Sequence, residues 1–349
     1  MADDTTVPVP RRRRMRKRLL GGGFAVVVVV AVFVFFLPRI ADYRDVWDVL
    51  KDLSWKDGLL LAAATLLNVV TFAPPWIAAL PGLGLRQALV LTQASTALSI
   101  VSPAGAAVGM AGSFAMLRSW GFKSGPVGLA VAVTGVWNQL ANLTFPIVAL
   151  ALLTAANESH AGLRTTALVG VVVLVVVVCA FVLALSSESR AYRVGELAAR
   201  LTNRTLRLVR RDPVSWGGES LAVFRLGTID LLRRRWHVIT LTTLVGHLTV
   251  FLVLLACIRT IGISTDQVSL VEAFAAWALV RILGALPLTP AGLGFVELGL
   301  SGALVAFGAS NADAVAATLL YRFLTVTPTL ALGLAAAATW RMHDSRGPV

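Results

Sequence analysis

The chain has 349 residues, of which 57% are hydrophobic and 14% are charged, and its mean hydropathy is +0.80. Soluble domains carry about 25% charged residues, so this composition excludes an ordinary soluble globule. The formal net charge is +13, but the basic residues gather beside apolar stretches, which is typical of membrane proteins and not of a nucleic-acid surface. We therefore expect an all-α polytopic membrane protein with no nucleic-acid partner.

The chain begins with a basic tail, residues 1–18, that we expect on the cytoplasmic side. Seven Lys or Arg residues lie between Arg11 and Arg18, and such segments stay on the cytoplasmic side of a membrane. The apolar run that follows resembles a signal peptide, but it is longer than the apolar region of one and lacks a small-residue cleavage site. We expect it to remain as an anchor.

Six apolar stretches are each long enough, at about 20 residues per span, to cross a bilayer as one helix. They are Leu19–Leu37, Leu59–Leu80, Val127–Leu153, Thr165–Leu185, Val238–Ile261 and Ala314–Trp340. Two further stretches, Ala88–Leu117 and Leu270–Phe307, have Gly/Pro-rich centres that interrupt a helix. The sequence thus predicts about six full spans and two broken ones in a single membrane domain, 19–340, followed by a polar tail, 341–349.

An Arg-rich loop, 186–237, divides this domain into a first half, 58–185, and a second half, 238–340. The loop holds eleven Arg against five acidic residues, so we place it in the cytoplasm together with both termini. Some of its Arg residues follow one helical strip beside apolar residues, which is typical of an interfacial helix on anionic headgroups. The strip comprises Arg193, Arg200, Arg204, Arg207 and Arg211.

The two broken stretches share a sequence motif. Ser102-Pro103-Ala104-Gly105 in the first corresponds to Thr289-Pro290-Ala291-Gly292 in the second, and a glycine, Gly121 or Gly308, follows each proline by eighteen residues. A hydroxyl residue before proline is a typical helix start, so each stretch is expected to fold as helix, break, helix. The alternative is a chance match in an Ala-rich chain.

The predicted topology makes the two motifs an inverted repeat, because the first broken stretch is entered from the cytoplasm and the second from the opposite face. Arms of about 14 to 17 residues span about 21 to 26 Å, which is short for a core about 30 Å thick and favours re-entrant helical hairpins of opposite orientation. Interrupted helices in inverted repeats are typical of secondary transporters. Free N–H groups at the start of the second arms would suit a phosphate headgroup.

The stretch Leu279–Glu297, LVRILGALPLTPAGLGFVE, resembles the transmembrane region of the lysylphosphatidylglycerol synthetase family. The resemblance continues to Tyr321-Arg322 and, more weakly, through Ser102–Gly121, so it covers most of residues 20–340. It implies the lipid-translocating half of such proteins, which moves an aminoacylated or other amphipathic phospholipid, including a glycosylated one, across the cytoplasmic membrane. Synthetase activity is not implied, because the longest soluble loop has only about 50 residues.

The resemblance has one departure in the first repeat. Family members often carry an acidic residue and an arginine after the first break, whereas Ala106–Met110 contains neither. Because of this difference, the usual lysyl-lipid substrate does not follow from the resemblance.

Charged residues inside apolar stretches are the first candidates for a substrate site, because a charge at mid-bilayer costs on the order of 3 kcal/mol. Arg281 and Glu297 lie eight residues on either side of Thr289, so a hairpin would place them at similar depth, as substrate ligands or as a purely structural pair. Arg322 would bind a lipid phosphate or form a salt bridge to Glu297 or Glu272. The predicted substrate-binding set is Arg281, Thr289, Pro290, Gly292, Gly294, Glu297, Arg322, Ser102, Pro103, Gly105 and Asn138.

Asn138 offers amide hydrogen bonds in the first half, either to substrate or between helices. His247 lies in mid-span, as a proton relay or as a packed hydrogen-bonding residue. Cys179 and Cys257 lie in separate spans without the spacing of a metal site, and the sequence has no ATP-binding loop and no zinc-hydrolase or nucleophile-elbow motif. We expect no cofactor, no metal and no enzyme activity.

Together these features predict a lipid flippase or transporter that works by alternating access, with membrane lipids and their anionic headgroups as partners. One alternative is a membrane-embedded lipid-modifying enzyme, which would need acidic or histidine residues clustered at one membrane face. Another is a non-catalytic subunit that delivers lipid to a partner enzyme.

Overall fold

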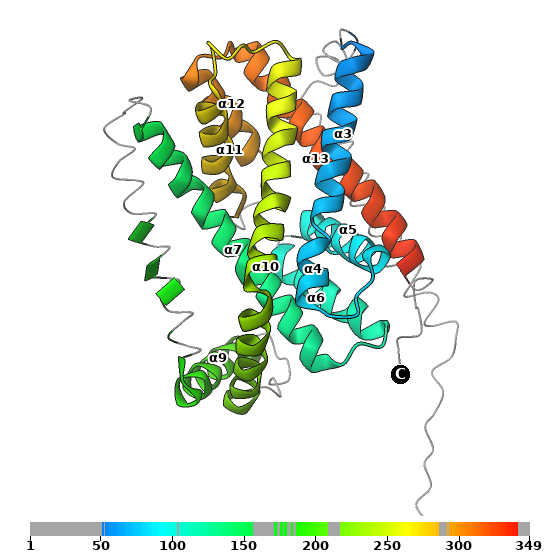
Figure 1. Cartoon of the computed structure of the whole chain (residues 1–349), viewed down its shortest axis with the longest axis vertical. Coiled ribbons are helices and arrows are strands. Elements are labelled where there is room, and N and C mark those ends of the chain that lie inside the picture. The colour runs from blue at the N-terminus through cyan, green and yellow to red at the C-terminus, as the bar shows by residue number, and fades with distance from the viewer. Residues whose placement is uncertain are drawn as a thin grey trace, which may run out of the picture. The chain divides into compact units, whose positions relative to one another are not determined.

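The computed structural model describes a helical unit (Figure 1). It describes residues 51, 53–102, 105–155, 171–172, 175–176, 178–179, 183, 186–208, 217–285, 292 and 294–340, and all of these except residue 51 belong to one compact unit. The predicted features outside them are the span Leu19–Leu37, most of Thr165–Leu185, both tails, Pro103, Thr289 and Pro290. Every element of the described residues is a helix, as the sequence predicts.

Four helical segments of the described residues are long and apolar enough to cross a bilayer, judged by length and composition. They are Trp55–Ala79, Ser124–Ala155, Gly218–Thr260 and Asn311–Ala337. They correspond to four of the six predicted full spans, within three residues at the ends where the predicted spans run further. The count of six stays a prediction, because Leu19–Leu37 and most of Thr165–Leu185 lie outside the described residues.

The first of these segments is divided by prolines. A capping box at Ser54 starts α3 (Trp55–Thr71), in which side chain and backbone satisfy each other's free groups. Two prolines then open α4 (Pro74–Ala79), and they cannot donate the backbone hydrogen bonds that would continue α3. The predicted span Leu59–Leu80 is therefore a pair of helices with a kink between them.

The Arg-rich loop is more helical than predicted. It is largely filled by α9 (Glu188–Leu208) and by the first part of α10 (Gly218–Thr260), so the helix expected from Val238 starts at Gly218. Glycines let the two helices approach closely, since a Cβ on Gly195 would lie 2.8 Å from the carbonyl oxygen of Gly217. With 43 residues, α10 is about 65 Å long and extends well beyond a core about 30 Å thick.

Both broken stretches fold as helix, break, helix, as predicted. The arms are α5 (Leu85–Val101) with α6 (Gly105–Ser119), and α11 (Leu270–Ala285) with α12 (Phe295–Phe307). The predicted start of the last arm at Pro290 is wrong, because α12 begins at Phe295. Gly292 and Gly294 have φ angles of 66° and 87°, which lie outside the right-handed helical region.

The glycines that follow the two hairpins occupy equivalent positions. Gly121 after α6 and Gly308 after α12 have φ angles of 90° and 126°. In both cases the next residue donates its N–H to a carbonyl oxygen five residues back, which is the pattern of a Schellman helix end. This match supports the correspondence of the two stretches inferred from their motifs.

Replacing Gly308 by alanine is expected to lower the free energy of unfolding by about 1–3 kcal/mol. Its backbone conformation disfavours L side chains, and a Cβ would lie 2.7 Å from the carbonyl oxygen of Gln267. Gly302→Ala, within α12, is the matched control, because no atom lies within 4 Å of its added Cβ and alanine favours a helix. Thermal unfolding in detergent compares the two variants, and equal midpoints would contradict the expectation.

The two halves of the unit pack against each other in a crossed manner. The hairpin helix α5 packs mainly on α13 (Asn311–Thr339), whereas α11 packs mainly on α7 (Ser124–Ala155). Figure 1 shows α3 and α10 running in opposite directions, and α7 and α13 also run in opposite directions. Each half thus places its hairpin on a long helix of the other half.

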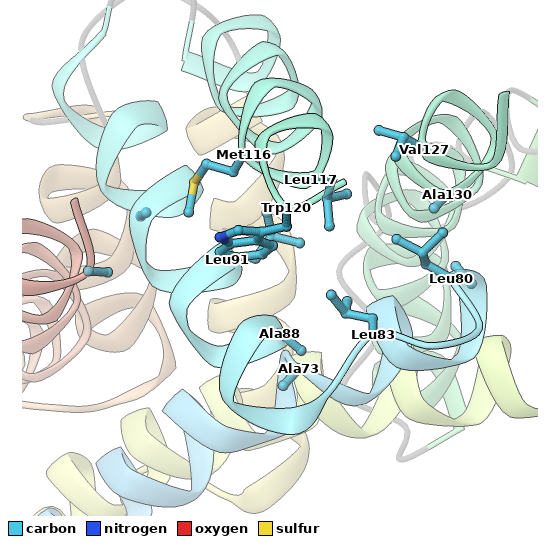
Figure 2. Packing of buried hydrophobic residues seen from close by; sticks show 13 residues of the cluster. Ala73, Leu80, Leu83, Ala88, Leu91, Met116, Leu117, Trp120, Val127 and Ala130 are labelled. Carbon is cyan, nitrogen blue, oxygen red and sulfur yellow. The ribbon is translucent and has the colours of Figure 1, made fainter. Parts of the chain in front are cut away.

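Small and branched apolar side chains form the core around α5 and α6 (Figure 2). Leu91 and Leu117 are fully buried there. Trp120 Nε1 donates to the carbonyl oxygen of Trp340 at 2.9 Å, which connects the end of α6 to the end of α13. Gly333 of α13 allows close approach to α5, because a Cβ at that position would lie 2.3 Å from the Cβ of Ala97.

Candidate functional site

The interior of the bundle contains a guanidinium group surrounded by neutral side chains. Arg281 of α11 donates to Asn142 Oδ1 of α7 through Nε at 3.2 Å and through Nη2 at 2.6 Å. Nη2 also lies 2.6 Å from His247 Nδ1 of α10. The guanidinium carbon is 4.8 Å from the centre of the Trp277 ring, a cation–π distance. Within the described residues, no carboxylate lies at ion-pair distance from Arg281.

Hydrogen-bond chemistry fixes the protonation of His247. A guanidinium only donates, so His247 Nδ1 accepts from Arg281 and carries no proton. The proton of the neutral ring is then on Nε2, which donates to Asn138 Oδ1 at 3.1 Å. Asn142 Nδ2 donates to Gln139 Oε1 at 3.2 Å. These five side chains, from α7, α10 and α11, form what we call the Arg281 network: one cation among neutral groups.

Aromatic rings enclose one end of the Arg281 network. Phe72 and Phe145 contact His247 edge-on, with centroid distances of 5.6 and 5.8 Å. Phe145 also lies 5.1 Å from Trp277. Because these rings exclude water, an unpaired charge in their vicinity is poorly solvated. The Arg281 network is therefore a place where an anion would be stabilised.

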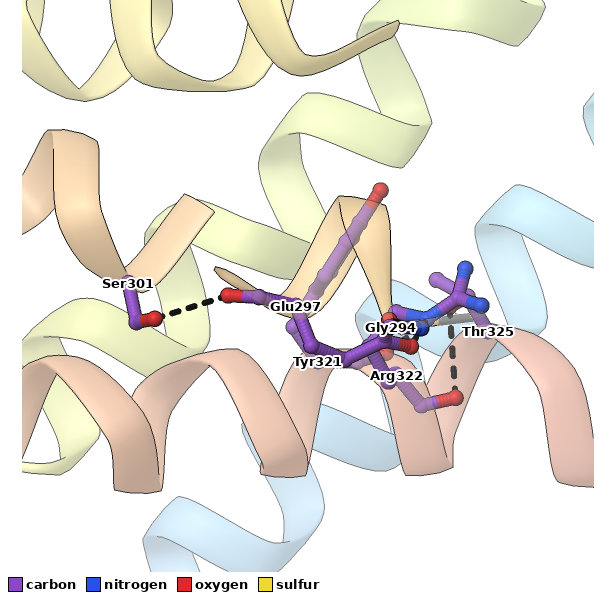
Figure 3. A network of polar contacts seen from close by, with 6 residues as sticks. All are labelled: Gly294, Glu297, Ser301, Tyr321, Arg322 and Thr325. Atoms are coloured by element: carbon purple, nitrogen blue, oxygen red, sulfur yellow. Dashed lines mark hydrogen bonds and ion pairs between the residues drawn. The ribbon is translucent and has the colours of Figure 1, made fainter. Parts of the chain in front are cut away.

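A second polar cluster lies at the start of α12 (Figure 3). Glu297 Oε1 accepts from Arg322 Nε of α13 at 2.6 Å, and the Glu297 and Arg322 side chains are 7% and 14% exposed. Glu297 Oε2 accepts from the N–H of Gly294 at 2.7 Å, and Ser301 Oγ donates to the Glu297 carbonyl at 2.7 Å. Both carboxylate oxygens of Glu297 are thus engaged within the protein.

The predicted pair between Arg281 and Glu297 is wrong. The two arms of the hairpin face different long helices, since α11 packs on α7 and α12 packs on α13. Arg281 therefore meets Asn142 and His247, while Glu297 meets Arg322. The salt bridge to Glu297 that was one of the two readings of Arg322 is confirmed.

The predicted free N-terminus of the last hairpin arm is also wrong for α12. Glu297 at the third helical position reaches back to the N–H of Gly294. A carboxylate there satisfies both the free amide and the positive end of the helix dipole. The protein's own side chain thus occupies the place expected for a headgroup phosphate.

A comparison of the sequence with known protein families identifies a membrane-protein family. A family model described as the lysylphosphatidylglycerol synthase TM region matches residues 23–333. The chain belongs to this family. The match confirms the resemblance found at Leu279–Glu297, and together with the bilayer-length helices it indicates a multi-pass membrane protein with a lipid-related function. No curated protein matches the sequence.

Of the predicted site residues in the first half, Asn138 is the one whose described contacts reach the Arg281 network. Asn138 joins the Arg281 network through His247. Ser102 ends α5 in an extended conformation, and Gly105 lies tightly against Ser99, whose carbonyl oxygen would be 2.2 Å from an added Cβ. In the described part of the chain, neither Ser102 nor Gly105 hydrogen-bonds to the Arg281 network. Pro103, Thr289 and Pro290 lie outside the described residues.

Asn142 and Trp277 contact Arg281, but they are not in the substrate-binding set predicted from the sequence. Asn142 lies one helical turn after Asn138 on α7, and two amides at this spacing on an apolar helix share one face. That spacing was a usable signal, because amides on apolar helices seek polar partners on neighbouring helices. Trp277 precedes Arg281 by one turn on α11, but a tryptophan in an apolar helix is ordinarily a packing residue.

Proposed function

We propose that this protein is a lipid flippase, which moves a phospholipid between the leaflets of the cytoplasmic membrane and binds the headgroup phosphate at Arg281. The observation that carries the proposal is the charge of the Arg281 network: a cation inside an apolar bundle whose described partners are all neutral. A buried charge without a counter-ion costs several kcal/mol. An anionic ligand would remove that cost.

A phosphate suits this position chemically. Arginine presents a planar fork of N–H groups that binds phosphate oxygens in a bidentate manner. In the proposed complex the phosphate takes some of the N–H donors that now contact Asn142 and His247. Those two side chains hold the guanidinium in place when no lipid is bound, and the acyl chains stay in the bilayer throughout.

The proposed movement is alternating access between two inverted halves. It is supported by the two interrupted stretches, the opposite directions of α3 and α10 (Figure 1), and the packing of each hairpin on the other half. Arms of 13 to 17 residues are about 20 to 26 Å long, which favours two re-entrant hairpins over full spans. With six full spans in addition to the hairpins, both termini are cytoplasmic. Inverted repeats with interrupted helices are typical of transporters.

In this function the chain binds and transports the lipid, without covalent chemistry or a cofactor. Membrane lipids are its ligands, and a separate lipid-modifying enzyme would supply any modified headgroup. Of the substrate-binding residues predicted from the sequence, Arg281 and Asn138 belong to the proposed binding site. Glu297, with its partners Arg322 and Gly294, holds the second hairpin to α13.

Lipid movement in proteoliposomes tests this function. The purified protein is reconstituted with phosphatidylglycerol carrying a fluorescent acyl chain, and dithionite then quenches only probe that reaches the outer leaflet. We expect quenching beyond the outer-leaflet fraction of protein-free vesicles, with no change in the mass of the lipid. Arg233→Gln, an exposed arginine on α10, is expected to behave like the unaltered protein.

Two results would overturn the proposal. One is folded protein that moves no phospholipid, with or without a proton gradient. The other is covalent conversion of the lipid detected by mass spectrometry, which would favour an enzyme instead.

A further inference from the structure

The charges inside the bundle do not balance. Arg281 and Arg322 contribute two positive charges, Glu297 contributes one negative charge, and His247 is neutral because its Nδ1 accepts from Arg281. Among the described residues, Glu297 is the one carboxylate with a buried side chain. Of the apolar stretches outside the described residues, 19–37, 103–104, 165–185 and 286–293 contain no Asp or Glu. Within the described part of the bundle, the interior therefore carries a net positive charge.

The single buried carboxylate is already engaged. One oxygen of Glu297 accepts from Arg322 and the other from the N–H of Gly294. Glu272, the other acidic residue of the second hairpin, accepts from the N–H of Ser269 and caps the start of α11. It lies nine residues before Arg281, or about 13 Å along the helix. Both carboxylates of the second hairpin therefore already accept hydrogen bonds within the protein.

We propose that this site selects phospholipids with a net negative headgroup and discriminates against headgroups that carry an ammonium group, including aminoacylated ones. This inference rests on the proposed function, because it names the substrate class of the same site. An anionic headgroup balances the charge of Arg281. An ammonium group brought beside Arg281 adds a like charge without a counter-ion, and such a contact is repulsive in a medium of low polarity.

A comparison of headgroups tests this selectivity. Probes with identical labelled acyl chains and three headgroups, phosphatidylglycerol, phosphatidylethanolamine and lysylphosphatidylglycerol, are moved by the reconstituted protein in separate vesicles. We expect phosphatidylglycerol to move at least about tenfold faster than the lysyl form, which corresponds to one unfavourable charge contact. Phosphatidylethanolamine is expected to lie between them.

A charge introduced at the site should alter the ratio of these rates. Asn142→Asp places a carboxylate where Arg281 donates two hydrogen bonds, so Arg281 is neutralised and the preference for phosphatidylglycerol is expected to disappear. Asn68→Asp is the matched control. Asn68 Nδ2 donates to Thr249 Oγ1 at 3.4 Å, outside the Arg281 network, and the ratio should stay as in the unaltered protein.

The outcomes separate this inference from the function on which it rests. Equal rates for phosphatidylglycerol and lysylphosphatidylglycerol would leave the flippase standing and overturn the selectivity. No movement of any probe by folded protein would overturn both. If Asn142→Asp does not fold, thermal stabilisation of the unaltered protein in detergent by each lipid gives the same comparison, and stronger stabilisation by the lysyl form would refute the inference.

Discussion

Replacing Arg281 by glutamine is expected to lower the rate of phosphatidylglycerol movement about ten- to a hundredfold, which corresponds to the loss of a charge-assisted hydrogen bond to the phosphate. Glutamine keeps a donor and much of the volume, but it removes the charge that attracts the headgroup. The measurement is the initial rate of dithionite quenching in proteoliposomes that contain equal amounts of folded protein.

Two further variants show whether the loss belongs to the phosphate contact. Arg281→Lys keeps the charge but loses the bidentate fork, so its rate should fall between those of glutamine and arginine. Arg233→Gln removes an exposed arginine of α10 and should retain the full rate. Movement by Arg281→Gln at the unaltered rate would remove Arg281 from the site.

Replacing Glu297 by glutamine is expected to destabilise the folded protein by about 3–5 kcal/mol, because it leaves the Arg322 guanidinium buried without its counter-ion. Arg322→Gln should have a similar effect, since it leaves the Glu297 carboxylate unpaired. The double variant Glu297→Gln/Arg322→Gln is expected to be more stable than either single variant, because it buries no lone charge.

The thiol of Cys257 reports this unfolding. Cys257 is fully buried in α10, whereas Cys179 is exposed, so in a Cys179→Ser background a thiol-reactive dye labels the protein only as it opens. Heating each variant in detergent with this dye gives four midpoints for a double-mutant cycle. Additive effects of the two single changes would show that Glu297 and Arg322 are not coupled.

The helices and their interruptions could be predicted from local properties of the sequence. Apolar length marked the four bilayer-length segments, and the Pro/Gly motifs marked the breaks after α5 and α11. Helix ends were less predictable. The expected start at Pro290 failed because Gly292 and Gly294 take positive φ angles, which glycine permits but does not require. The extension of α10 to Gly218 was missed because its first part is polar.

The sequence by itself determined a helical membrane protein of the lysylphosphatidylglycerol synthase TM region family, with Arg281, Glu297 and Arg322 as charges that need partners in an apolar bundle. Hydrophobicity and the cost of a bare charge are properties of each residue and its neighbours. Only the tertiary structure decided which side chains these charged residues contact. Arg281 meets Asn142 across 139 positions of the chain, because partner choice depends on which helix faces which, and helix packing is not encoded in local periodicity.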